Sequence, residues 1–185
     1  PRIAPIQAVI IPIIFKGKEK KVWKEVDKIK AKLEKLGIRY HLDARSDSPG
    51  RKYYDWEIKG VPLRIEIGPR DVKNKQVVLF ERFSGKKTKL KMKDLGKMPK
   101  ILDDIHKRML KKEKLRLQNN IIFADQKKEV TENVEKGKIV KAYWCGNEKC
   151  YNALIRLGEG YEGFGTNTES KGSGLCIHCK KTAKE

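Results

Sequence analysis

The chain has 185 residues, of which 44 are Lys or Arg and 24 are Asp or Glu, so its formal net charge is +20 at pH 7. Hydrophobic residues make up 38% of the sequence, which is enough for a packed core and excludes disorder throughout. No apolar run approaches the roughly 20 residues that cross a bilayer, and no signal-peptide pattern opens the chain. We therefore expect a cytoplasmic protein with no membrane partner.

The excess of positive charge is the first functional signal. Between Lys86 and Arg116 there are 13 basic and 4 acidic residues. A strongly basic surface most simply serves a polyanion, and nucleic acid is the commonest polyanion inside cells. A heat-adapted surface rich in ion pairs would explain the high charged fraction of the sequence, but it would not explain the imbalance of sign.

The N-terminal part of the sequence alternates between strand and helix patterns. Gln7–Phe15 is a nearly continuous apolar run, typical of a strand that is covered on both faces. The residues from Val22 to Leu36 carry an apolar position every three or four residues, which predicts an amphipathic helix that stops at Gly37. Because Ile38–Leu42 has the pattern of a second strand, we expect a βαβ unit and a sheet that is at least partly parallel.

The middle of the chain adds further strands and then a helical region. Val61–Ile67 alternates in polarity, which places Arg64 and Glu66 on the polar face of the expected strand. The other expected elements are a helix over Arg51–Lys59, strands over Gln76–Phe80 and Lys87–Met92, and helical structure with breaks from Met98 to about Glu135.

The composition changes near Lys136, after which the chain holds all four of its cysteines and several glycine-rich turns. We therefore expect three parts. The first covers residues 1–100, a helical connector covers residues 101–135, and a small α+β module covers residues 136–185.

The cysteines form two pairs, Cys145-x4-Cys150 and Cys176-x2-Cys179, which are separated by 25 residues. Four thiolates suit a tetrahedral Zn²⁺ ion, and each short spacing lets one turn present two sulfurs to the same ion. A small module with few aliphatic residues also needs such a cross-link. We predict one zinc ion per chain, and its role should be structural because four cysteines leave no open coordination position.

Other readings of the cysteines stay open. Two disulfides or buried free thiols are alternatives, although a reducing compartment argues against disulfides. A redox-active pair is disfavoured because Cys176 and Cys179 lack a βαβ setting, and His178 between them is a possible substitute ligand. No nucleophile pattern and no phosphate-binding loop is found, so no catalytic residue is predicted.

Three charged residues form a second candidate site. Glu57 lies on an expected helix, Arg64 on the next strand, and Asp71 just beyond a Gly-Pro turn. A carboxylate accepts hydrogen bonds from guanine N1–H and N2–H₂, and an arginine donates to O6 and N7, so such a group can read an unpaired base. On these residues alone, an ordinary surface ion pair is the simpler explanation.

At these residues the sequence resembles a known family. The segment Tyr54–Asp71 (YDWEIKGVPLRIEIGPRD) closely resembles the anticodon-binding domain of class II prolyl-tRNA synthetases. Ile3–Gln7 resembles the junction that follows the catalytic domain in that family. Tyr143–Cys145, together with the second cysteine pair, resembles the zinc-binding extension of the archaeal/eukaryotic-type branch. The resemblance covers nearly the whole chain, about residues 3–185.

The resemblance implies a mixed five-stranded sheet with flanking helices, followed by the zinc-binding module. It also implies a role for the charged group, because Glu57, Arg64 and Asp71 match the family residues that read the two guanines at the second and third anticodon positions of proline tRNAs. The expected partner is therefore the anticodon stem-loop of proline tRNA.

In intact members of the family, a catalytic domain forms prolyl-adenylate from proline and ATP with Mg²⁺, and then transfers the prolyl group to the tRNA. The motifs of that domain are missing from this sequence, so we expect a C-terminal fragment that has no chemistry of its own. In the parent protein, commonly a homodimer, it would lie beside its own catalytic domain. Members of this branch also tend to end in a tyrosine, whereas this sequence ends in Lys184-Glu185.

Two other functions account for part of the sequence. A general RNA-binding or ribosome-associated zinc protein would share the charge and the cysteines, but it would give no reason for the Trp56–Asp71 string. An α/β nucleotide-binding enzyme is disfavoured because no phosphate-binding loop is found.

Overall fold

The computed structural model describes residues 4–15, 17–158, 161–163, 165 and 172–184. The chain divides into two compact units, the first ending at Lys111 and the second beginning at Lys112. This division falls within helix α4 (Met98–Asn120). In the part of the chain that is described, no helix combines the length and the apolar content needed to cross a membrane.

A mixed five-stranded sheet in the order β2-β1-β3-β4-β5 lies at the centre of the first unit. β1 pairs in parallel with β2 and β3, whereas β3 with β4 and β4 with β5 are antiparallel pairs. The sequence-based expectation of this sheet is confirmed. Its strands are β1 (Ala8–Pro12), β2 (Tyr40–Leu42), β3 (Leu63–Ile67), β4 (Gln76–Glu81) and β5 (Lys86–Lys91).

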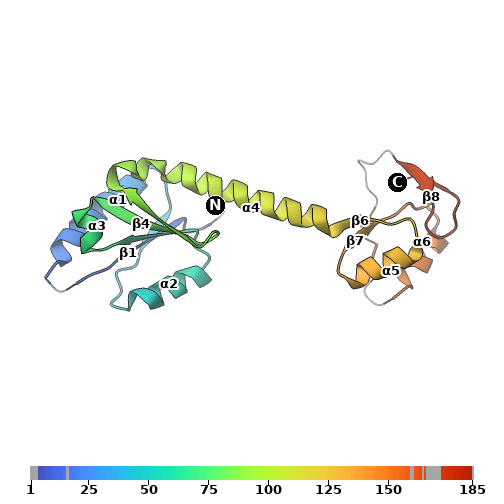
Figure 1. The fold of residues 1–185 in the computed structure, drawn as a ribbon, viewed down its shortest axis with the longest axis horizontal. Helices are drawn as coiled ribbons and strands as arrows, with labels where there is room; N and C mark the ends of the chain where they lie inside the picture. Colours follow the sequence, from blue (N-terminus) through green and yellow to red (C-terminus); the bar gives the residue numbers. More distant parts are fainter. Residues whose placement is uncertain (1–3, 16, 159–160, 164, 166–171, 185) are drawn as a thin grey trace. The chain divides into compact units, whose positions relative to one another are not determined.

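Helices cover both faces of this sheet (Figure 1). On one face, α1 (Glu19–Lys35), the 3₁₀ helix η1 (Met92–Lys97) and the start of α4 contribute to the main hydrophobic core. On the other face, α2 (Pro49–Ile58) packs through Trp56 against β1. The two helices lie on opposite faces because β2 and β3 flank β1 on opposite sides and each crossover is right-handed. A short helix that the sequence did not predict, α3 (Pro69–Lys73), follows β3.

The second unit is built from shorter elements. The strands β6 (Ile121–Phe123) and β7 (Ile139–Lys141) pair in parallel, with α5 (Lys127–Glu135) between them in the sequence. Helix α6 (Glu148–Ile155) follows, and β8 (Ser173–Leu175) pairs with β9 (Thr182–Lys184) as an antiparallel hairpin. The β6 strand interrupts the helical region expected up to Glu135, because Ile121, Ile122 and Phe123 favour a strand over a helix.

Candidate nucleic-acid interface and metal centre

Arg64 lies on β3, on the sheet face that α2 covers, and its side chain is only 5% exposed. Its guanidinium carbon lies over both rings, 3.8 Å from the ring centroid of Tyr53 and 4.1 Å from that of Phe80. This stacking makes burial of the charge tolerable, since a guanidinium is weakly hydrated and packs well on aromatic faces. The polar face expected from the sequence pattern is therefore a buried one.

Two carboxylates bind the guanidinium. Nε of Arg64 donates to Oε1 of Glu66 at 2.9 Å, and Nη1 donates to Oε1 of Glu57 at 2.7 Å. Glu57 is 44% exposed, whereas Glu66 is 6% exposed and its second oxygen lies 3.2 Å from Nζ of Lys87. Among the described residues, Nη2 of Arg64 has no hydrogen-bond partner, and it is not one of the fully buried polar atoms that lack one. Solvent therefore reaches Nη2.

The position of Glu57 follows from how α2 is anchored. Ser48 caps the start of the helix by accepting from the backbone N–H of Arg51 at 3.4 Å. Trp56 Nε1 donates to Oδ2 of the buried Asp43 at 2.7 Å, and Arg82 Nε donates to the backbone carbonyl of Glu57 at 2.9 Å. With these contacts along the helix, the side chain of Glu57 is held beside Arg64.

Two pKa shifts mark the polar groups around α2. The hydrogen bonds from Arg45, helped by the Trp56 N–H, hold the pKa of Asp43 well below its usual range against the effect of burial. Burial and then the charge of Glu66 raise the pKa of Tyr53 to about 12. At neutral pH, Asp43 is therefore ionised and Tyr53 is a neutral phenol next to the Arg64 guanidinium.

Asp71 has a different environment from the other two predicted site residues. It lies in the first turn of α3, where Oδ2 accepts from the backbone N–H of Gly68 at 3.1 Å and Oδ1 accepts from Gln76 Nε2 at 3.3 Å. The structure thus brings Glu57 and Arg64 together. In the part of the chain that is described, no hydrogen bond or ion pair joins Asp71 to either of them.

Sequence reasoning did not identify Tyr53, Glu66 and Phe80 as the surroundings of Arg64. Two signals were available, since Tyr53 precedes Glu57 by four residues on one helix face, and Glu66 follows Arg64 by two residues on one strand face. Phe80 could not be found this way. Its place opposite Arg64 depends on the register between β3 and β4.

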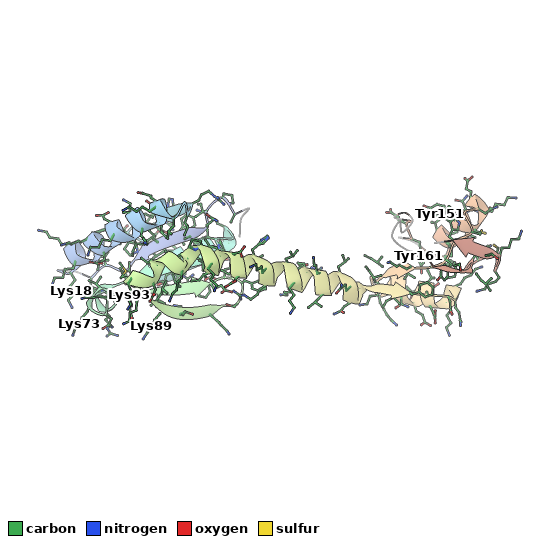
Figure 2. The ribbon with its side chains drawn as sticks, turned by 90° about the horizontal axis from the view of Figure 1, so that it is seen from above. Lys18, Lys73, Lys89, Lys93, Tyr151 and Tyr161 are labelled. Carbon is green, nitrogen blue, oxygen red and sulfur yellow. The ribbon has the colours of Figure 1, made fainter. Side chains whose placement is uncertain are left out.

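Lysines on strand β5 lie on the same sheet face as this site. The strand register aligns Lys87 with Phe80, Lys89 with Val78 and Lys91 with Gln76 on the same sheet face as Arg64. Figure 2 shows Lys18, Lys73, Lys89 and Lys93 gathered at one end of the first unit. None of these four forms an ion pair with a described carboxylate. These four lysines therefore give this end of the first unit positive charges that no ion pair with a described carboxylate neutralises.

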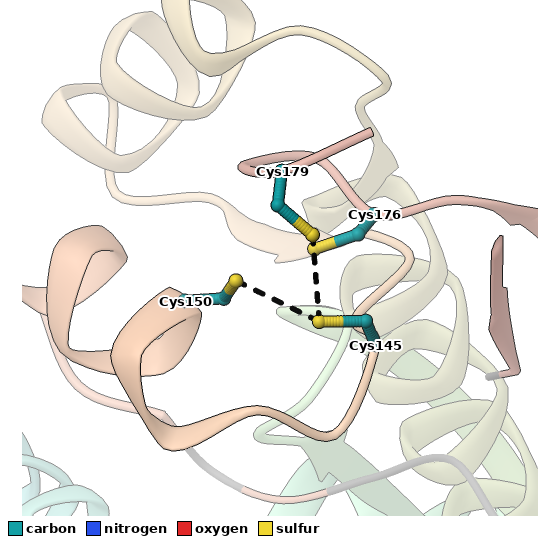
Figure 3. Close-up of side chains that lie close together, drawn as sticks. All are labelled: Cys145, Cys150, Cys176 and Cys179. Atoms are coloured by element: carbon teal, nitrogen blue, oxygen red, sulfur yellow. Dashed lines mark hydrogen bonds between the residues drawn. The ribbon is translucent and has the colours of Figure 1, made fainter. Parts of the chain in front are cut away.

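The four cysteines come together in the second unit (Figure 3). Sγ of Cys145 lies 3.6 Å from Sγ of Cys150 and 3.6 Å from Sγ of Cys179, and all four sulfurs lie within 4.8 Å of one another. These distances are too long for disulfides. Four sulfurs at about 2.3 Å from a tetrahedral ion would be about 3.8 Å apart, so the cluster can hold a metal ion.

Local backbone structure presents each cysteine pair. Cys145 follows β7, and Cys150 lies in the first turn of α6, whose start is capped by the Asn147 side chain. The other pair lies at the tip of the β8–β9 hairpin, where the N–H of Cys176 donates to the carbonyl of Lys181 at 2.7 Å. Lys180 adopts a left-handed φ of 59°, which lets the chain turn back after Cys179.

The thiols of the cluster have unequal acidity. Burial opposes ionisation of Cys176, but hydrogen bonds from the backbone N–H groups of Cys179, His178 and Cys145 outweigh it and lower the pKa of Cys176. Burial and the neighbouring thiols raise the pKa of Cys150. His178 is not part of the four-sulfur group, and its Nδ1 is buried without a partner among the described residues.

The chain matches a known protein family and has curated relatives. The family model described as "Anticodon binding domain" matches residues 7–100. The proline–tRNA ligase of Methanosarcina mazei is 37% identical over 181 residues, which covers 97% of this chain and 38% of that protein. The proline–tRNA ligase of Pyrococcus abyssi is 43% identical over 152 residues, or 81% of this chain and 32% of that protein. The chain thus spans about two fifths or less of the length of these relatives.

Two solved structures of a prolyl-tRNA synthetase resemble the chain in both fold and sequence. The prolyl-tRNA synthetase of Cryptosporidium parvum in complex with halofuginone and AMPPNP superposes with a TM-score of 0.87 at 33% identity, covering 100% of this chain and 40% of that one. The same enzyme in complex with L-proline and AMP gives a TM-score of 0.80 at 36% identity, covering 84% of this chain and 34% of that one.

Proposed function

Since the chain belongs to the anticodon-binding domain family, we propose that it is the tRNA-recognising part of a cytoplasmic proline–tRNA ligase and binds the anticodon stem-loop of proline tRNA. Relatives named proline–tRNA ligase align with 97–100% of the chain, which supports this assignment. In the proposed parent protein, a homodimer, a separate catalytic domain would use ATP and Mg²⁺ to attach proline. A general RNA-binding protein is not favoured.

The geometry around Arg64 carries the proposal. Nη2 is a donor that solvent reaches, and Oε2 of the half-exposed Glu57 has no bonded donor among the described residues. Guanine presents the acceptor O6 beside the donor N1–H, which matches one arginine donor next to one carboxylate acceptor. Adenine presents a donor and then an acceptor at the same two positions. Donor would then face donor and acceptor would face acceptor, so Arg64 and Glu57 disfavour adenine. We propose that Arg64 and Glu57 read one anticodon guanine in this way.

We propose Asp71 as a reader of the second guanine, as the family resemblance implies. Its carboxylate is partly exposed, and each oxygen accepts only one hydrogen bond within the chain. An ionised carboxylate has about four acceptor positions, so both the helix cap and a guanine N1–H can be served together.

We propose that the metal held by the cysteines is a single structural Zn²⁺ ion. Thiolates are soft ligands that suit zinc, and Sγ distances of 3.6 Å agree with tetrahedral coordination. Cys145, Cys150, Cys176 and Cys179 would supply all four ligands, which leaves no position for a substrate. The ion would cross-link α6 to the β8–β9 hairpin.

The decisive experiment measures binding of two RNA stem-loops that differ only at the second and third anticodon positions, with guanine in one and adenine in the other. The wild-type chain should prefer the guanine RNA. Arg64→Lys keeps the charge but loses the planar fork. It should reduce this preference by about 1–3 kcal/mol, the usual contribution of a good base contact, and leave binding of the adenine RNA nearly unchanged.

Arg108→Lys is the matched control for this substitution. Arg108 also uses two nitrogens in hydrogen bonds to carboxylate oxygens, in its case both of Glu81 at 2.7 Å each, but it lies on α4 and away from the proposed site. The preference for guanine should persist in this variant. Equal affinity of the wild-type chain for the two RNAs would contradict the proposed function.

A further inference from the structure

Glu66 is a buried carboxylate that the proposed base contacts do not use. It lies on β3, two residues after Arg64 and on the same sheet face. Its side chain is 6% exposed and lies between two cations, with Oε1 at 2.9 Å from Arg64 Nε and Oε2 at 3.2 Å from Lys87 Nζ. Burying a carboxylate costs free energy unless it is paired in this way, which suggests that Glu66 has a role beyond stability.

The contacts of Arg64 leave its guanidinium almost no freedom to rotate. A guanidinium has five N–H donors in one plane. Glu66 binds Nε and Glu57 binds Nη1, while the rings of Tyr53 and Phe80 pack closely against the guanidinium. Among the described residues, Nη2 is the guanidinium nitrogen that makes no hydrogen bond, and the contact to Glu66 determines that this nitrogen is Nη2 and not Nε.

The charge balance around Arg64 also depends on Glu66. Two carboxylates, Glu57 and Glu66, face two cations, Arg64 and Lys87, so the cluster has no net charge. If Glu66 were neutral, the cluster would carry one excess positive charge and would attract any RNA somewhat more. The neutral Glu66 oxygen would also hold Nε more weakly than a carboxylate does, so Nε could compete with Nη2 for the base or for a phosphate.

We propose that Glu66 is the positioning residue that makes Arg64 selective for guanine. It acts through Arg64 and touches no base itself. By holding Nε, it presents a single guanidinium edge beside Glu57, and by its charge it suppresses binding that does not depend on the base. The inference rests on the proposed function of the Glu57–Arg64 pair.

Loss of a positioning role has a signature that loss of stability lacks. Glu66→Gln should lower the preference for guanine over adenine RNA by roughly tenfold, the order of one good base contact. Its affinity for the adenine RNA should stay the same or increase, because a negative charge has been removed. A substitution that merely damaged the fold would weaken binding of both RNAs.

The test compares Glu66→Gln with Glu81→Gln, by fluorescence anisotropy with the same two stem-loops. Glu81 is a matched control because it also pairs with an arginine, Arg108, and the substitution changes the net charge equally. It lies on β4, aligned with Leu63 and therefore on the opposite sheet face from Arg64. Glu81→Gln should keep the wild-type ratio of the two affinities.

A wild-type ratio in Glu66→Gln would overturn the inference, and so would an equal loss of affinity for both RNAs. If that variant does not fold, Glu66→Asp decides, because it keeps the charge and is too short by one methylene to hold Nε. It should also lower the ratio, and an unchanged ratio would overturn the positioning role. If the wild-type chain itself does not distinguish the two RNAs, the proposed function has failed, and the inference fails with it.

Discussion

The two units of the chain are stabilised in different ways. In the first unit, 16 buried hydrophobic residues form one continuous cluster between the sheet and α1, η1 and α4. In the second unit, each of the two clusters among the described residues contains three buried residues, and one of them consists of Cys150, Cys176 and Ala183. A core this small rarely supports a fold without a cross-link. The first unit is therefore expected to fold by apolar packing, and the second only when its four cysteines hold a metal ion.

Metal removal is expected to have the largest effect of the changes considered, and to affect the second unit but not the first. Binding of a structural zinc ion contributes about 10–16 kcal/mol of apparent folding free energy in small zinc domains. Chelation should therefore abolish the dispersed NMR signals of the second unit, and those of β1, β3 and β4 should persist. Elemental analysis should find one zinc ion per chain before chelation. Unchanged spectra after complete metal removal, or stoichiometric disulfides in the native chain, would contradict the difference between the units.

A cavity in the hydrophobic core of the first unit should destabilise that unit and leave the second unit intact. Ile65 is fully buried in the centre of β3, between β1 and β4. Ile65→Ala should lower the free energy of unfolding of the first unit by about 2–5 kcal/mol, because it removes buried methyl groups and leaves a cavity. Urea unfolding followed by tryptophan fluorescence measures this, and the zinc content should stay at one per chain. A loss below about 1 kcal/mol would show that the core is looser than the structure indicates.

Acid should weaken the first unit through Asp43. The pKa of Asp43 is lower in the folded chain than in the unfolded chain, so its contribution is complete above about pH 4 and disappears as the pH falls further. Asp43→Asn should destabilise the first unit at pH 7 by about 1–3 kcal/mol, through the weakened bonds to Trp56 and Arg45. The difference between wild type and variant should shrink toward pH 3. A difference that grows on acidification would show that Asp43 is not the ionised partner.

RNA binding should depend on the lysines of the first unit more than on those of the second. Lys89→Ala should weaken binding of guanine and adenine RNAs alike, and it should reduce the slope of log affinity against log salt by about 1. Lys128→Ala on α5 is the matched control, since Lys128 is 84% exposed and lies in the second unit. An equal effect of the two substitutions would extend the RNA contact to the second unit.

Elements with strong local patterns were predictable from the sequence. The apolar run at β1 predicts a buried strand, and the regular apolar spacing of α1 predicts an amphipathic helix. Each pattern fits only one secondary structure that buries all of its apolar side chains. The cysteine spacing likewise predicted a four-sulfur cluster, because two short pairs can converge on one ion.

The environment of Arg64 was not predictable from local pattern. Alternation along β3 identified Arg64 and Glu66 as a polar face, but it could not show that α2 packs over that face or that Phe80 would lie opposite. Both depend on the crossover and on the strand register, which are contacts between residues distant in the sequence. Short elements such as α3 and β6 were missed because three to five residues carry too little periodicity.

A crystal structure of the chain bound to the anticodon stem-loop of a proline tRNA tests the central claim most directly. An anticodon guanine should lie with O6 at about 2.7–3.2 Å from Nη2 of Arg64 and N1 at a similar distance from Oε2 of Glu57. Arg64 should keep its contacts to Glu66, Tyr53 and Phe80, with side chains placed as in the free chain. A stem-loop bound with both guanines away from Glu57 and Arg64 would contradict it.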